Sequence, residues 1–186
     1  SFNYKMTNLT YSGDSNFKSK ENITDNVLKI FIIYSVLSFI FFSLLNISGV
    51  RLFNSLNLTM TLVSGGGFLP TDNLNEIIQT NYQKLVLIVT LVLSMLNFYL
   101  LFNIFNKKTL LKEHHEDLYL FLLSFVLIIL IYFNKFEGLN IIISVLSSLA
   151  NSGITLIKTD NNLSLYFLLI TILGGSLVSN TSGIKL

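Results

Sequence analysis

Three long stretches of this sequence carry almost no charged residues, and they constrain the fold more than any other feature. Residues 27–47 contain a single lysine near their start, and residues 85–105 and 118–134 contain no charged residue at all. A transmembrane helix needs about 20 consecutive, mostly apolar residues, and each stretch reaches or approaches that length. The whole chain is 52% hydrophobic and only 12% charged, well below the charged fraction of soluble domains. The sequence therefore predicts an all-α membrane protein that crosses the bilayer several times.

The composition also excludes several classes of function. The chain has no cysteine, so it forms no disulfide and no thiolate metal site. Its formal net charge of +2 gives no reason to expect a nucleic-acid partner. No span contains a pair of carboxylates, and no phosphate-binding glycine motif is present. His114 and His115 lie in a charged linker, where a solvated loop is the expected environment rather than a metal site. We expect no enzyme activity and no bound cofactor.

Two short helical segments, each followed by a break that contains glycine, form an internal repeat. Residues 49–63 precede "SGGGFLPTDN", and "GLNIIISVLSSLA" precedes "NSGITLIKTDNN". As helices, both segments are only about 20 Å long, which is too short to cross a bilayer. Aligning Gly67 with Gly153 places the short helices, the breaks and the "TDN" turns in the same order. Each unit is therefore expected to comprise a span, a short pore helix, a loop and a second span.

This repeat divides the chain into four parts. They are a polar lead-in (1–26), a first pore-loop unit (27–106), a charged linker (107–117) and a second unit truncated in its last span (118–186). Eight basic residues lie on the side of the lead-in and the linker, against four on the other side, which makes the first side cytoplasmic. The sequence starts at Ser1 without Met and stops at Leu186 in mid-pattern. We expect it to be a fragment of a longer protein.

The two breaks suit the lining of an ion path. A helix that stops inside a membrane leaves backbone groups unsatisfied unless protein or a water-filled cavity surrounds them. Its C-terminal end is the negative end of the helix dipole, which favours a cation. Carbonyl oxygens of a following extended segment can replace the hydration shell of that ion. For each break the alternative is an ordinary tight turn. We expect an ion filter of backbone carbonyls, formed by Ser64, Gly65, Gly66, Gly67, Asn151, Ser152 and Gly153.

The last segment, "GGSLVSNTSGIK", begins after an apolar run of only eleven residues, 163–173. Such a run spans about 16 Å as a helix, so the break begins near the middle of the membrane. Glycines at both ends of the segment leave its backbone free to move. A kinked helix packed closely against a neighbour is the alternative. We expect a gating loop beneath the filter, formed by Gly174, Gly175, Ser176, Ser179, Asn180, Gly183 and Lys185.

These motifs resemble the membrane subunit of the Trk/Ktr-type potassium uptake family. "SGGGFLPTDN" stands where the second filter of that family typically reads Thr-Gly-Gly-Phe-Ser, and "GGSLVSNTSGIK" aligns without gaps with a family motif close to GGCAGSTAGGIK. The stretch "NFYLLFNIFNKKTLLKEHHEDLYLFL" is also similar to the family. The chain departs from the family at Gly65, where a threonine is usual, and at "ANSGI", which replaces Thr-Thr-Thr-Gly-Phe. The resemblance covers roughly residues 20–186 and implies the second and most of the third of four pore-loop units.

The resemblance also implies a function and partners. The implied function is uptake of potassium, carried as a substrate, across the bacterial inner (plasma) membrane by a multi-pass protein. The implied partners are the missing units of the same chain, a second copy in a homodimer, cytoplasmic nucleotide-binding regulatory subunits and the lipid bilayer. Two alternatives stay open. A secondary transporter with broken helices would need ionisable or substrate-binding groups at mid-membrane, and a structural or assembly subunit of a respiratory-type complex would show no ion flux.

Overall fold

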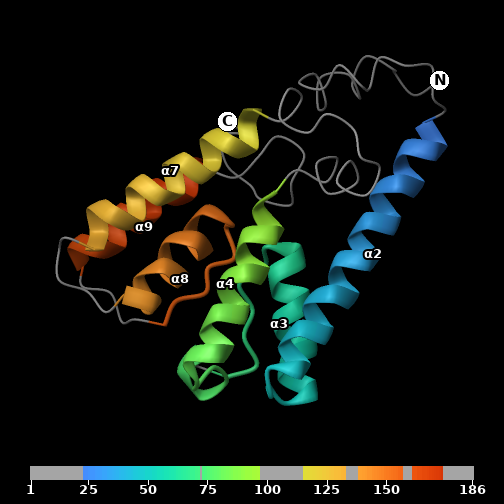
Figure 1. Cartoon of the computed structure of the whole chain (residues 1–186), viewed down its shortest axis with the longest axis horizontal. Coiled ribbons are helices and arrows are strands. Elements are labelled where there is room, and N and C mark those ends of the chain that lie inside the picture. Colours follow the sequence, from blue (N-terminus) through green and yellow to red (C-terminus); the bar gives the residue numbers. More distant parts are fainter. Residues whose placement is uncertain (1–22, 72, 97–114, 133–137, 157–160, 174–186) are drawn as a thin grey trace.

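The computed structural model describes residues 23–71, 73–96, 115–132, 138–156 and 161–173, and these residues form helices joined by loops (Figure 1). The expected all-α architecture is confirmed. In the part of the chain that the structure describes, no helix combines the length and the hydropathy needed to cross a membrane. The elements in chain order are α2 (Ile23–Ile47), α3 (Leu52–Ser64), the 3-10 helix η2 (Leu74–Glu76), α4 (Asn81–Met95), α7 (His115–Tyr132), α8 (Gly138–Leu149) and α9 (Asn161–Leu173).

The first unit begins with α2 and α3, which pack against each other. Leu37, Phe41 and Leu45 recur every four residues on α2 and are almost fully buried, so they form one apolar stripe. The chain reverses at Gly49, whose φ of 88° lies in the left-handed region that favours glycine. Helix α3 then returns alongside α2 with Leu58 as one of its fully buried residues.

The loop after α3 runs back toward the end of the molecule at which α3 began, and α4 starts there (Figure 1). A capping box fixes this start, because the Thr80 side chain accepts from the Gln83 amide while the Gln83 side chain accepts from the Thr80 amide. The Gln83 side chain also donates to the Ser48 carbonyl over 3.4 Å. One polar side chain thereby ties the beginning of α4 to the turn between α2 and α3.

The second unit is arranged around α8. This helix contacts α7 and α9 of its own unit and α4 of the first unit, so it joins the two halves of the chain. Its residues from Ser144 to Leu149 are all buried. This half of α8 therefore has no solvent face, although three of its residues, Ser144, Ser147 and Ser148, are polar.

The two short helices correspond at a spacing of 86 residues, since α3 begins at Leu52 and α8 begins at Gly138, and the same spacing separates Gly67 from Gly153. The loop after α8 also returns to the end of the molecule at which α8 began (Figure 1). Three boundaries differ from the expected ranges. Helix α7 begins at His115, inside the segment expected to be linker, and α4 and α2 each begin a few residues before the expected spans. The remainder of the second expected span, 97–105, and the expected gating loop lie outside the described residues.

Candidate ion-filter site

Both short helices end in the same backbone conformation. Helix α3 is capped by Gly65 at a φ of 64°, and the Gly66 amide donates to the Thr61 carbonyl over 3.2 Å. In the second unit Asn151 has a φ of 53°, and the Ser152 amide donates to the Ser147 carbonyl over 3.0 Å. Glycine adopts the left-handed region freely, and asparagine is among the few other residues that tolerate it. The repeat therefore extends to the backbone geometry of the loops.

Gly67 and Gly153 lie side by side, although 86 positions separate them. Their φ angles are 68° and 63°. A Cβ atom added to Gly67 would lie 3.0 Å from the Ser152 carbonyl oxygen, and one added to Gly153 would lie 3.7 Å from the Gly67 Cα. The two loops thus meet backbone to backbone, and a side chain at residue 67 would force them apart.

A hydroxyl group from the last turns of each short helix holds the residue after each of these glycines. The Thr61 Oγ1 donates to the Phe68 carbonyl. The Ser147 Oγ accepts from the Ile154 amide over 2.8 Å and lies 3.0 Å from the Ser152 Oγ. Thr61 and Ser147 occupy equivalent positions of the repeat, as do Phe68 and Ile154. Each loop is therefore attached to its own helix by a side chain as well as by the backbone.

The two loops differ in how much of them is open. In the first loop Ser64, Gly66 and Phe68 are exposed, and the Phe68 side chain is 82% exposed. In the second loop Ser152 is completely buried, while Gly153 is exposed. Both the side chain and the backbone of Ser152 are therefore enclosed by protein, and Gly153 is the more open of the two residues.

Neighbouring helices fix the loops from outside. The Asn151 side-chain amide donates to the Thr171 carbonyl of α9 over 3.2 Å, and the Tyr34 hydroxyl of α2 donates to the Val63 carbonyl over 3.4 Å. These two contacts bind the end of each short helix to another helix of its own unit.

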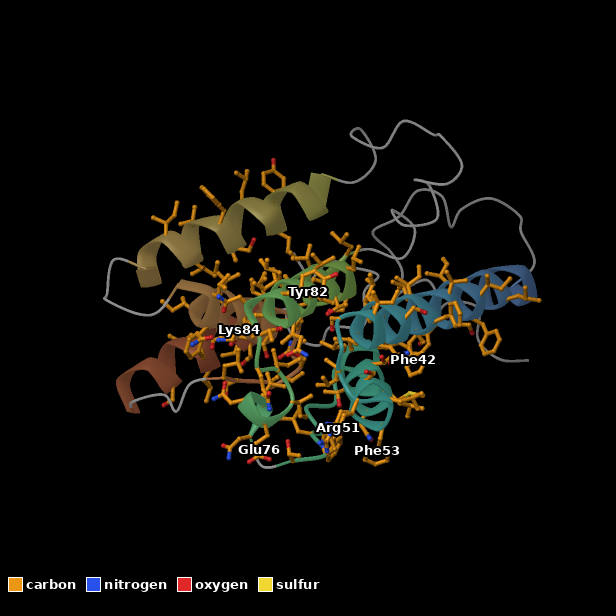
Figure 2. All side chains as sticks on the ribbon, turned by 60° about the horizontal axis from the view of Figure 1, so that its bottom comes forward. Phe42, Arg51, Phe53, Glu76, Tyr82 and Lys84 are labelled. Carbon is orange, nitrogen blue, oxygen red and sulfur yellow. The ribbon has the colours of Figure 1, made fainter. Side chains whose placement is uncertain are left out.

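Two further contacts join the units to each other. The Lys84 Nζ of α4 donates to the Asn140 Oδ1 of α8 over 2.9 Å, and the Asn75 side-chain amide donates to the Leu156 carbonyl over 3.0 Å. Figure 2 shows Lys84 on α4, and Arg51 and Glu76 at the end of the molecule where α3 begins. Neither α3 with its loop to Thr71 nor residues 138–156 contain a charged residue. Among the described residues, no group of three or more His, Cys, Asp or Glu side chains is placed to hold a metal ion.

Six of the seven residues expected in the filter therefore lie in two loops that meet at Gly67 and Gly153, and the seventh, Ser64, is the last residue of α3. The sequence analysis did not identify Thr61 and Ser147, which hold these loops, or Lys84 and Asn140, which join the two units. Thr61 and Ser147 carry a signal in the sequence, because hydroxyl residues recur at the same place in both copies of the repeat. Lys84 and Asn140 carry none, since their contact depends on how the two units pack.

These elements define a class of all-helical protein in which two short helices end at a pair of touching loops. The crystal structure of the potassium transporter TrkH from Vibrio parahaemolyticus shares this fold, with a TM-score of 0.76, 18% sequence identity and coverage of 88% of this chain and 38% of that chain. The expected resemblance to Trk/Ktr-type proteins is thereby confirmed in the fold.

A curated relative is similar in sequence as well. It is an uncharacterized cation transporter of Methanocaldococcus jannaschii, 27% identical over 167 residues. The match covers 86% of this chain, and the chain spans 33% of the length of that relative. No family model matches the chain.

Proposed function

We propose that this chain forms part of the ion path of a membrane cation transporter, and that the transported ion is potassium. The observation that supports the proposal most directly is the meeting of Gly67 and Gly153 in matching left-handed conformations. The TrkH transporter that shares the fold is a potassium transporter, and the relative from M. jannaschii carries the description of a cation transporter. Transport, rather than catalysis, is the proposed activity.

The helix arrangement supports attraction of a cation. Helices α3 and α8 both end at the loops, so the negative ends of two helix dipoles lie there. No charged side chain belongs to either helix or to the adjoining loop residues up to Thr71 and Leu156. The negative potential at the loops therefore arises from carbonyl groups, which bind a weakly hydrated cation without holding it too tightly to leave.

The proposed filter consists of the seven residues expected from the sequence. Its carbonyls come from 64–67 in the first unit and from 151–153 in the second. The proposed gate at 174–185 lies outside the described residues and stays a prediction from the sequence. The proposed surroundings are a bacterial inner membrane, further units of the same chain, a second copy of the subunit and nucleotide-binding regulatory subunits.

The test is rubidium uptake into proteoliposomes that contain the full-length protein, with potassium or sodium as competitor. Gly67→Ala places a Cβ 3.0 Å from the Ser152 carbonyl oxygen and strains a left-handed residue, so it should displace both loops. We expect uptake that potassium blocks in the unchanged protein. In the variant we expect at least a tenfold loss of the preference for potassium over sodium, which corresponds to about 1.4 kcal/mol.

Gly49→Ala is the matched control. Gly49 also has a left-handed φ, of 88°, but it lies at the turn between α2 and α3, where the nearest atom to an added Cβ is 3.9 Å away. It should therefore lower stability without changing ion preference. Absence of uptake from correctly folded, unchanged protein would contradict the proposal and favour the structural-subunit alternative.

A further inference from the structure

The hydroxyl groups of Thr61 and Ser147 hold the two loops from positions that the repeat makes equivalent. We infer that Ser147 is a positioning residue that sets the direction of the Gly153 carbonyl at the meeting point of the loops, and that Thr61, its counterpart, fixes the next peptide group of the first loop. The inference rests on the proposed ion-transport function and deepens it. Neither side chain belongs to the seven residues that form the proposed filter.

The geometry of the peptide bond links Ser147 to the direction of the Gly153 carbonyl. The Ile154 amide and the Gly153 carbonyl belong to the same peptide group, and in a trans peptide these two bonds point in opposite directions. The structure describes no cis peptide bond in the chain segments it covers. Because the Ile154 amide points at the Ser147 Oγ, 2.8 Å away, the Gly153 carbonyl must point away from Ser147.

The surroundings make this orientation hard to change. Ile154 is fully buried and Ser147 is 1% exposed, so no water is available to replace the Ser147 oxygen. A buried amide without an acceptor costs about 1–3 kcal/mol. The Ser147 oxygen is itself held by the Ser152 hydroxyl, 3.0 Å away, and Ser152 in turn lies 3.3 Å from the Ser147 carbonyl oxygen. These bonds form a closed, buried network behind the second loop.

Thr61 acts on the first loop in a different way. Its hydroxyl donates to the Phe68 carbonyl, so it directs that carbonyl toward α3. The peptide that follows Phe68 is therefore fixed, and with it the end of the loop that contains Gly67. The first loop is held through a carbonyl and the second through an amide, so the two hydroxyls fix different peptide groups of the repeat.

The experiment compares two test variants and two controls of the full-length protein in proteoliposomes, and adds two rescue variants that keep the hydroxyl. Ser147→Ala and Thr61→Val remove one hydroxyl each with little change of shape. Their controls are Ser148→Ala and Thr59→Val, which remove equally buried hydroxyls whose bonds stay inside the same helices, to Ser144 and Ser55. The measured quantities are the potassium-to-sodium preference in rubidium uptake and the melting temperature.

We expect Ser147→Ala and Thr61→Val to lower the ion preference about three- to tenfold, as expected from the loss of one hydrogen bond. The controls should keep the preference of the unchanged protein at a similar melting temperature. Ser147→Thr and Thr61→Ser, which keep the hydroxyl, should restore it. If either Ser147→Ala or Thr61→Val fails to fold, the remaining variant and its rescue variant still test the inference.

Two outcomes overturn the inference. In one, the two test variants and both controls keep the original preference. In the other, the controls lose as much preference as Ser147→Ala and Thr61→Val, so that any buried hydroxyl in these helices has the same effect. Both outcomes leave the proposed function intact, because potassium-blocked uptake by the unchanged protein tests that function separately.

Discussion

Asn151 stands where the first unit has a glycine, and it serves two purposes at once. Its φ of 53° ends α8 in the left-handed region, while its side-chain amide donates to the Thr171 carbonyl of α9. Gly65, at the equivalent position of the first unit, supplies only the backbone conformation. Asparagine at position 151 therefore has less backbone freedom than glycine, but it forms a hydrogen bond to α9 that glycine could not form.

Substitutions at Asn151 separate the two purposes. Asn151→Gly keeps the left-handed backbone and loses the bond to Thr171, whereas Asn151→Ala loses the bond and also strains the backbone. We expect Asn151→Ala to be less stable than Asn151→Gly by about 1 kcal/mol. The measurement is the thermal unfolding midpoint of the purified full-length protein. An alanine variant at least as stable as the glycine variant would contradict this account of the loop.

The contacts of the hydroxyl residues Thr61 and Ser147 with the loops could not be predicted from the sequence. Three successive glycines indicate an unusual backbone conformation, so the first loop could be identified from the sequence. A threonine or serine in an apolar helix usually bonds within its own helix, so its presence alone does not indicate a contact with a loop. Thr59 and Ser148 bond within their own helices, while Thr61 and Ser147 reach out to the loops. Only the path of the chain after each helix distinguishes these pairs, and that path is a tertiary property.

At the scale of elements, the sequence predicted the order of the helices and their approximate bounds. Apolar runs and glycine breaks determine these features locally. The position of α8 between α7, α9 and α4 was not predictable, because the serines of its polar face, Ser144, Ser147 and Ser148, are buried and therefore do not mark a solvent side.

The contact between α4 and α8 should stabilise the packing of the two units against each other. Lys84 is half-buried and bonds to Asn140 over 2.9 Å, so the bond is charge-assisted. We expect Lys84→Met to lower the free energy of unfolding by about 1 kcal/mol. In a double-mutant cycle with Asn140→Leu, the two effects should be clearly less than additive, since either change alone breaks the bond. Full additivity would show that the two side chains do not stabilise each other.

At the scale of the whole molecule, the first loop is open and the second is largely enclosed. Ser64 is exposed, whereas Ser152 is completely buried. In a full-length protein freed of any other cysteine, Ser64→Cys should react with a water-soluble thiol reagent, and the reaction should reduce rubidium uptake. Ser152→Cys should stay unmodified over the same time. Equal reactivity at the two positions would contradict the enclosure of the second loop.

The repeat was predictable at this scale, because both copies keep their elements in the same order. The contact between Gly67 and Gly153 was not predictable, since nothing local to either loop specifies a partner so far along the chain. The sequence shows only that the two glycines occupy equivalent places in the two copies, and the structure places them side by side.

The presence of both loops in one chain has a consequence for how such a site can evolve. In an assembly of identical subunits, one codon change alters every copy of a loop simultaneously. Here each loop has its own codons, so a substitution can alter one loop and leave the other unchanged. The glycine-rich first loop and the enclosed second loop already differ in sequence and burial, so a substitution harmless in one need not be harmless in the other.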